Sequence, residues 1–247
     1  MVSTNRWHKA QKHERDYWQK KAARIAYGST EQLNWYAWKA VEMEKRLQGH
    51  LNEEHKQSAK ILEIGSGPIG IVTFLKWGER YTIDPLEDFY KSNPVLSHQR
   101  DSSIHYCQGT GEKLPFEKKY FSLVILDNVL DHVNEAESVL KEIFRVLSDD
   151  GVLYLAVNVH TKLGGVLHSV LSKLKIDKGH PYTFTAKSIR NFIREHQFLV
   201  QAETVNDYYL AREKDRKSTS LKEKIKGYTG LSEFIYYSVC KKRSSTV

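Results

Sequence analysis

Two carboxylates flank a glycine-rich stretch whose spacing could serve ligand binding. The acids are Glu63 and Asp84, and the glycines between them are Gly65, Gly67 and Gly70, in the pattern G-x-G-x-x-G. The run before the glycines is mostly apolar and predicts a strand, and we expect a helix to follow the turn. Glycines let the backbone approach a ligand closely, and a helix N-terminus offers N–H groups to it. An acid at the tip of the next strand can accept both hydroxyls of a ribose, so the pattern predicts a site for a nucleoside-bearing cofactor.

Glu63 indicates which cofactor this is. The glycine spacing alone fits a dinucleotide-binding loop, because Asp84 lies roughly 20 residues further on, where that loop has its ribose acid. A carboxylate two residues before the first glycine would repel a pyrophosphate but attract an ammonium or a sulfonium group. S-adenosylmethionine has both groups and a ribose for Asp84. The alternative is that Glu63 ends a strand and points to water, and we favour ligand binding because open α/β sheets bind ligands at such strand ends.

The composition is that of an ordinary globular chain of 247 residues, with 40% hydrophobic and 28% charged residues. This length suits one large α/β domain, or one domain with a cap. No apolar run reaches the roughly 18 residues of a membrane span, and the polar N-terminus lacks the apolar core of a signal peptide. The two cysteines, Cys107 and Cys240, suggest neither a disulfide framework nor a zinc site. We therefore expect a cytoplasmic protein without a membrane partner.

The net charge of +8 is concentrated at the two ends of the chain. Residues 1–56 contain 11 Lys and Arg against 7 Asp and Glu, and residues 211–247 contain 10 against 4. A basic excess can attract an anionic substrate or RNA. No RNA-binding signature accompanies it, so we favour solvated helix faces and a tail over a nucleic-acid partner.

From residue 59 onward, short apolar runs alternate with helical ones. Strands are predicted at about 59–64, 80–84, 103–107, 121–127, 151–158, 198–206 and 233–240. Such runs, separated by helices, imply parallel strands that are buried on both faces. Helices are predicted at 133–147 and, after an N-cap at Thr185, at 186–196. Residues 160–184 break this rhythm and are predicted to form a lid or insertion.

Residues 1–56 are predicted to form a helical cap that precedes a main domain at 57–247. Four of the five tryptophans fall in this segment. Its aromatic residues are Trp7, Tyr17, Trp18, Tyr27, Trp35, Tyr36 and Trp38. These rings could pin the helices to the main domain, or they could close over the cofactor with a ring near its sulfonium. For any single ring we favour packing.

Four segments, in this order, carry a resemblance to a known family. They are Leu62–Gly70, Ile83–Leu86, Gly109–Phe116 and Ser122–Val133. They resemble the motif that wraps the methionine moiety, the ribose-binding end of the second strand, the adenine loop "GDAEKLPF" and the fourth-strand motif ending in "LEHV". The family is that of the class I S-adenosylmethionine-dependent methyltransferases, especially the methyltransferase type 11 group. The resemblance covers roughly residues 59–160.

The resemblance implies a Rossmann-like, doubly wound α/β fold with S-adenosylmethionine as cofactor. Its sheet would have seven mostly parallel strands, with the last one antiparallel. On the matching positions it implies a cofactor site formed by Glu63, Gly65, Ser66, Gly67, Gly70, Asp84, Pro85, Thr110, Gly111, Glu112, Asp127 and Asn128. One departure concerns Thr110, which stands where the family carries an Asp that accepts a bond from the adenine amino group. A hydroxyl accepts without charge, so this bond is predicted to be weaker.

Two histidines are candidate catalytic bases. Methyl transfer from a sulfonium needs mainly alignment and exclusion of water, and a base only where the nucleophile must lose a proton. His132 follows the fourth strand and has a suitable pKa class, although it could instead orient the helix start or the cofactor. His180 lies in the predicted lid, in a "GHP-x-x-F" loop similar to those of carbohydrate and natural-product methyltransferases, and it could instead pack the loop. We predict no metal, because the third carboxylate of catechol-type enzymes is not identifiable.

The predicted function is methylation of a small-molecule acceptor, first of all a sugar-like or natural-product hydroxyl. No Asn/Asp-Pro-Pro-Tyr/Phe follows the fourth strand and no Pro-Cys nucleophile occurs, which disfavours exocyclic-amine, glutamine and cytosine C5 methylation. An RNA or protein methyltransferase that uses the basic ends is the second interpretation. A non-catalytic S-adenosylmethionine-binding regulator is the third, and a dinucleotide oxidoreductase is the fourth.

Overall fold

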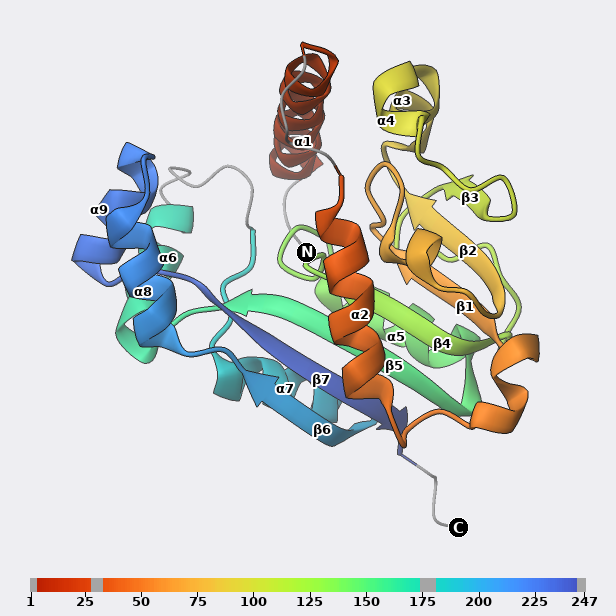
Figure 1. Cartoon of the computed structure of the whole chain (residues 1–247). Helices are drawn as coiled ribbons and strands as arrows, with labels where there is room; N and C mark the ends of the chain where they lie inside the picture. The colour runs from red at the N-terminus through yellow and green to blue at the C-terminus, as the bar shows by residue number, and fades with distance from the viewer. Residues whose placement is uncertain (1–3, 28–32, 174–180, 244–247) are drawn as a thin grey trace.

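A computed structural model of the chain describes residues 4–27, 33–173 and 181–243. Its centre is one seven-stranded sheet with helices on both faces (Figure 1). In chain order the strands are β1 (Lys60–Ile64), β2 (Glu79–Asp84), β3 (His105–Gln108), β4 (Phe121–Asp127), β5 (Leu147–Val159), β6 (Phe198–Val205) and β7 (Phe234–Lys242). All seven predicted strands are present, with ends shifted by a few residues.

The strands are arranged in the order β3-β2-β1-β4-β5-β7-β6. The first five pair in parallel, whereas β7 inserts between β5 and β6 and is antiparallel to both. This confirms the expected seven-stranded, mostly parallel sheet with an antiparallel last strand. The chain direction across the sheet reverses between β1 and β4, and the carboxyl ends of strands at such a switch point form the usual ligand crevice of open α/β sheets.

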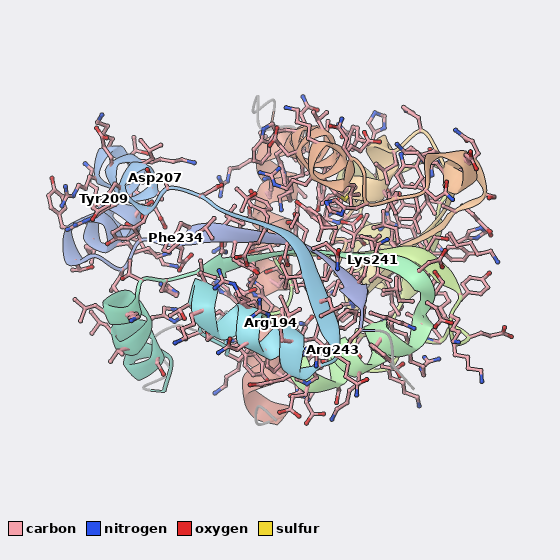
Figure 2. All side chains as sticks on the ribbon, turned by 90° about the horizontal axis from the view of Figure 1, so that it is seen from below. Arg194, Asp207, Tyr209, Phe234, Lys241 and Arg243 are labelled. Atoms are coloured by element: carbon pink, nitrogen blue, oxygen red, sulfur yellow. The ribbon has the colours of Figure 1, made fainter. Side chains whose placement is uncertain are left out.

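The helices are short apart from the first. They are α1 (Thr4–Ala26), α2 (Trp35–Leu47), α3 (Glu87–Ser92), α4 (Pro94–Ser97), α5 (Ala136–Val146), α6 (Lys162–Lys173), α7 (Ala186–Glu195), α8 (Tyr208–Lys217) and α9 (Leu221–Thr229), with 3₁₀ turns η1 (Glu53–Ser58) and η2 (Ile71–Phe74). Beyond the Phe234 end of β7, α8 and α9 lie outside the sheet, and Tyr209 points away from it (Figure 2). Within the described part of the chain, no helix is long and apolar enough to cross a lipid bilayer.

Alternate residues of β4 pack into two separate cores. Val124 and Leu126 lie in one core with apolar residues of α5 and α7, and Leu123 and Ile125 lie in the other with α2 and η2. Helix α7 begins as predicted, because Thr185 accepts a hydrogen bond from the Ser188 N–H at 3.1 Å in a capping box. A sheet buried on both faces holds its strand ends rigidly, which a ligand site requires.

The helix that we expected after the glycine turn is absent, and that prediction was wrong. Gly70 is followed by the single 3₁₀ turn η2, and then by β2. The reason is that α2 covers this face of the sheet, with Ala40, Met43 and Leu47 buried in the same core as η2. The apolar residues after the turn are buried against α2, and they form a 3₁₀ turn instead of an α-helix.

The N-terminal segment contributes two helices with different positions. α2 packs directly on the sheet, whereas α1 stands over the strand ends and packs on α4 (Figure 1). The division of the chain at residue 56 stays a prediction. Of the predicted lid at 160–184, α6 and residues 181–184 are described, and His180 lies outside the described residues.

Candidate functional site

A cavity of about 910 Å³ opens at the carboxyl ends of β1, β2 and β4. Its volume is in the range of roughly 300–1,000 Å³ that is usual for small-molecule and cofactor sites. Eleven of the twelve predicted cofactor residues line it, and His132 lines it as well. The exception is Gly70. Helix α1 forms a further wall, and residues of α6 and α9 border the opposite end.

Tyr36 of α2 fixes the glycine turn through a hydrogen bond. The Tyr36 hydroxyl donates a hydrogen bond of 3.0 Å to the Ser66 carbonyl. Gly67 has a φ of +63°, and a Cβ there would lie 2.4 Å from the Tyr36 hydroxyl oxygen. A side chain at Gly67 would therefore strain the backbone and push α2 away.

Gly70 acts indirectly, by positioning Glu63. Its φ is +78°, and a Cβ there would lie 2.7 Å from the Glu63 carboxylate. The turn at Gly70 lets the Val72 N–H donate to Glu63 Oε2 at 3.0 Å. The predicted cofactor residue Gly70 thus shapes the loop behind the cavity wall.

The Glu63 carboxyl is buried at the end of β1 and has an unusual protonation equilibrium. Burial raises the pKa of Glu63 to about 7, with a smaller contribution from the nearby Asp127, and backbone N–H donors and Lys39 oppose this rise. A carboxyl group with a pKa of about 7 can lose its proton near neutral pH when a cationic ligand enters the cavity. Contact of Glu63 with the cofactor stays a prediction.

Asp84 joins the tip of β2 to the glycine turn. Its Oδ2 accepts the Gly67 N–H at 2.9 Å, and its Oδ1 accepts the Leu86 N–H at 2.8 Å. Burial raises the pKa of Asp84 to about 6, against the effect of these two donors. Each carboxylate oxygen has a further lone pair with which it can accept from a ligand hydroxyl.

The loop after β3 brings Thr110, Gly111 and Glu112 to the cavity wall. Glu112 Oε1 accepts the backbone N–H groups of Asn134 and Glu135, at 2.8 and 3.2 Å. Glu112 therefore fixes the entry to α5 as well as facing the cavity. Contact of this loop with an adenine stays a prediction.

The end of β4 carries an ion pair that the sequence did not reveal. Asp127 is paired with Lys39 of α2, and the Lys39 ammonium lies 5.0 Å from the centre of the Trp35 ring. Asn128 has a φ of +59°, and its Oδ1 accepts a hydrogen bond of 2.7 Å from Asn158. Asn tolerates this left-handed backbone better than most residues do, so the strained position is matched to its residue type.

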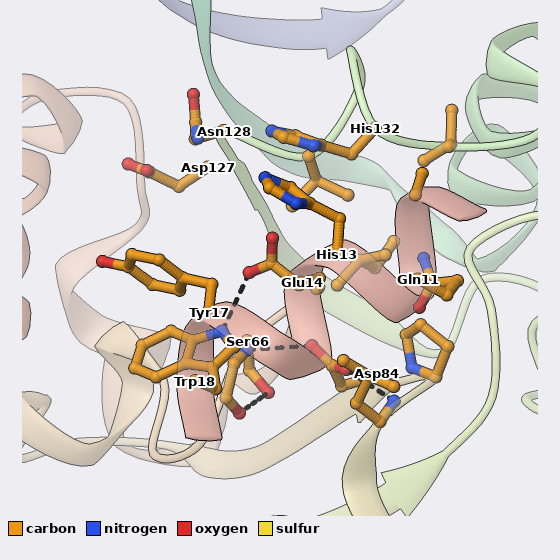
Figure 3. A pocket seen from close by; sticks show the side chains of 18 of the residues that line it. Gln11, His13, Glu14, Tyr17, Trp18, Ser66, Asp84, Asp127, Asn128 and His132 are labelled. Atoms are coloured by element: carbon orange, nitrogen blue, oxygen red, sulfur yellow. Dashed lines mark hydrogen bonds between the residues drawn. The ribbon is translucent and has the colours of Figure 1, made fainter. Parts of the chain in front are cut away.

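His132 lies at the cavity, with its side chain partly exposed. Its Nε2 is 3.8 Å from the buried carboxylate of Asp131. Figure 3 shows His13 and Glu14 of α1 facing the same space as Asn128 and His132. Titratable groups from two distant parts of the chain thus meet at one end of the cavity.

Helix α1 contributes aromatic and polar residues to the cavity wall, and only the aromatic ones could be singled out from the sequence. Trp7, Tyr17 and Trp18 line the cavity, as do Trp35 and Tyr36, whereas Tyr27 and Trp38 are exposed to solvent. Trp18 donates a hydrogen bond of 2.8 Å to Glu14, one turn earlier (Figure 3). The polar residues Gln11, His13, Glu14 and Lys39 carried no sequence signal, because their helices reach the cavity only through tertiary packing.

The donor set fits S-adenosylmethionine. Glu63, Asp84 and Asp127 all line the cavity, which therefore offers carboxyl groups to a cationic amino-acid moiety and to ribose hydroxyls. Gly70 is followed by a 3₁₀ turn and not by an α-helix whose N-terminal N–H groups could hold a pyrophosphate, so a dinucleotide would fit poorly.

The comparisons with known proteins agree with this arrangement. Residues 62–155 match the model of a family described as "Methyltransferase domain". The chain is 30% identical over 117 residues to the ubiquinone/menaquinone biosynthesis C-methyltransferase UbiE of Vibrio vulnificus, an alignment that covers 40% of this chain and 45% of that protein. It is 26% identical over 110 residues to the putative methyltransferase YrhH of Bacillus subtilis, covering 43% and 61%. The chain thus spans about half the length of the curated relatives it matches.

Solved structures show the same fold at low sequence identity. Geranyl diphosphate C-methyltransferase from Streptomyces coelicolor superposes with a TM-score of 0.65 at 13% identity, covering 89% of this chain and 88% of that one. A putative sarcosine dimethylglycine methyltransferase from Galdieria sulphuraria gives 0.59 at 16% identity, covering 89% and 88%.

Proposed function

We propose that this chain, whose residues 62–155 belong to a class I S-adenosylmethionine-dependent methyltransferase domain, transfers a methyl group to a small-molecule acceptor. The acceptor atom that we favour is the oxygen of a sugar-like or natural-product hydroxyl. Similar proteins carry names that describe C-methylation and N-methylation, so carbon and nitrogen acceptors are the alternatives to test.

The cofactor would be held by the residues around the glycine turn. Bound there, S-adenosylmethionine supplies a methyl group that is already activated. Glu63 would neutralise its cationic end and Asp84 would accept its ribose hydroxyls, while the positive φ angles of Gly65 and Gly67 allow the turn that lines its site. The task left to the protein is to align the acceptor and to exclude water.

The acceptor would lie between α1, α9 and the end of β4. His132 faces this space, and its Nε2 lies 3.8 Å from the carboxylate of Asp131. His132 is therefore suited to remove a proton from an acceptor hydroxyl. His180, the second candidate base, stays a prediction.

The observation that carries the small-molecule assignment is the covering of the cavity by α1. Trp7, Gln11, Glu14 and Trp18 form a wall directly over the strand ends, and Leu221 and Ile225 of α9 border the other side. A cavity enclosed in this way suits a small acceptor better than a nucleic acid or a folded protein.

The experiment is methyl transfer from labelled S-adenosylmethionine. The full chain is incubated with a small-molecule extract, with total RNA or with total protein, and the label is measured in each fraction. We expect label in the small-molecule fraction together with S-adenosylhomocysteine. Label in the RNA or protein fraction alone would overturn the acceptor class, and cofactor binding without product in any fraction would favour a regulator.

A matched pair of variants tests the base. His132→Asn should lower kcat about 100-fold or more, the usual loss of a general base, with little change in cofactor affinity. His105→Asn is the control, because His105 lies on β3 with an exposed side chain and does not line the cavity. An equal kcat in both variants would remove His132 from this role.

A further inference from the structure

Two imidazoles and a carboxylate come together near the α9 end of the cavity. The groups are His160, directly after β5, His168 of α6, and Glu233, directly before β7. One ligand atom from each lies within 4.8 Å of the others. Both histidines are buried, at 5% and 6% exposure, and the carboxylate is half-buried. His168 also lines the cavity, so the cluster is part of its wall.

The backbone fixes two of the three groups relative to each other. Val159 and Phe234 are the last paired residues of the antiparallel β5–β7 ladder, so His160 and Glu233 are the next opposed positions. His160 is held from a second side, because its N–H donates to the Phe184 carbonyl at 2.9 Å. The approach of these two side chains is therefore a property of the sheet.

The two histidine rings lie close enough together to bind one metal ion. The rings of His160 and His168 are stacked, with centroids 4.4 Å apart and planes inclined by 24°. The neutral imidazole is the form of histidine that binds metals. His168 Nδ1 lies 2.8 Å from the Thr183 hydroxyl. A bond of this kind orients a metal-binding ring and presents its Nε2 to the ion.

We propose that His160, His168 and Glu233 form a binding site for a divalent transition-metal ion of the Zn²⁺ type. Two histidines and one carboxylate are the ligand set of metal sites that keep at least one open coordination position. Because His168 faces the cavity, an open position on this ion would bind an oxygen or nitrogen of a ligand inside it.

Lys226 competes with a metal ion for the carboxylate. Its Nζ lies 3.1 Å from Glu233 Oε1 and 3.9 Å from Glu223 Oε1. A carboxylate has about four lone-pair positions, so Glu233 can bind an ion through one oxygen while Lys226 remains on the other. The lysine charge still opposes a cation, which predicts a site of moderate affinity that becomes tighter when this charge is removed.

The test is a titration of the metal-free full chain with Zn²⁺ in competition with a chromophoric chelator. We expect one ion per chain, with affinity lowered 10- to 100-fold by His168→Asn and by Glu233→Gln. His98→Asn is the control, since His98 is exposed and distant in sequence, and it should bind as the wild type does. Lys226→Met should bind more tightly than the wild type, a gain that no unfolded variant could give.

Zn²⁺ affinity that is equal in the wild type, His168→Asn and Glu233→Gln would overturn the site. A second readout addresses the open position. With Co²⁺ in place of Zn²⁺, acetohydroxamic acid should change the visible absorption of the bound ion. A Co²⁺ spectrum that is insensitive to acetohydroxamic acid would contradict an open position facing the cavity.

Discussion

Glu63 and Asp84 are the two residues whose chemistry defines the site, and burial changes both. It raises the pKa of Glu63 to about 7 and that of Asp84 to about 6. Both carboxyls nevertheless accept backbone N–H bonds from the turn that they flank. The same two carboxyls therefore stabilise the turn and set the charge that a ligand beside it would meet.

Asp84→Ala should weaken S-adenosylmethionine binding by about 2 kcal/mol, or roughly 30-fold, because a charge-assisted pair of bonds to the ribose is lost. Isothermal calorimetry measures this directly. Asp150→Ala is the control, because Asp150 is an exposed residue near the start of β5 that does not line the cavity. Equal losses in the two variants would contradict the ribose assignment.

Glu63 should make cofactor affinity depend on pH. A cationic ligand favours the ionised carboxylate, and the pKa of about 7 in the ligand-free protein means that binding must remove a proton below that pH. We therefore expect S-adenosylmethionine affinity to rise between pH 6 and pH 8 in the wild type. In Glu63→Gln the affinity at pH 8 should be lower and this rise should be smaller. The same pH profile in both proteins would show that another group is responsible.

Among the elements, α2 has a role that the sequence pattern did not reveal. It covers the sheet face beside β1 and holds the glycine turn through Tyr36. The apolar residues after the turn predicted a helix, and local pattern alone could not show that a helix from residues 35–47 already occupies that face. In contrast, Thr185 and the apolar stripe of α7 were predicted correctly, because capping and amphipathic spacing are local properties.

The variant Tyr36→Phe tests whether α2 stabilises the glycine turn through the Tyr36 hydroxyl. The change leaves the buried Ser66 carbonyl without its donor, which should cost about 1–2 kcal/mol in the free energy of unfolding and weaken cofactor binding. Tyr27→Phe is the matched control in the same N-terminal segment, because Tyr27 is 92% exposed. Denaturant melts and calorimetry of both variants provide the measurement, and identical behaviour would contradict this role of α2.

Helix α1 should respond to the cofactor more than the sheet does. It stands over the strand ends and contributes Gln11, Glu14 and Trp18 to the cavity wall. Bound S-adenosylhomocysteine should therefore slow amide hydrogen exchange in α1, while exchange in β5 stays as it was. Unchanged exchange in α1 would mean that it is not a cover for the cofactor.

At the scale of the whole molecule, the sheet could be predicted from the sequence, whereas the residues that line the cavity could be predicted only in part. The parallel strands and the glycine turn are encoded in contiguous segments, so their positions followed from local patterns, whereas the cofactor roles of the residues beside them stay predictions. Lys39 could not be found in this way, because it meets Asp127 across 88 positions in the sequence. Likewise Glu233 meets His160 through the β5–β7 register and His168 through α6, so this cluster could not be found from spacing along the sequence.

The stability of the ligand-free protein should fall as pH rises from about 5 to 7.5. Glu63 and Asp84 have higher pKa values when folded than when unfolded, so the folded state binds more protons in this window and deprotonation destabilises it. The loss is on the order of 2 kcal/mol for each group. Denaturant melts of Glu63→Gln should show a flatter dependence than the wild type. A wild-type stability that rises through this window together with the variant would contradict the buried acids as its source.

The most direct test of the central claim is a calorimetric titration of the full chain with S-adenosylmethionine and, separately, with NAD. The two buried acids and the 3₁₀ turn that stands where a helix would follow Gly70 predict one binding site for S-adenosylmethionine and no detectable heat with NAD. Binding of NAD with none of S-adenosylmethionine would contradict the assignment of the cavity.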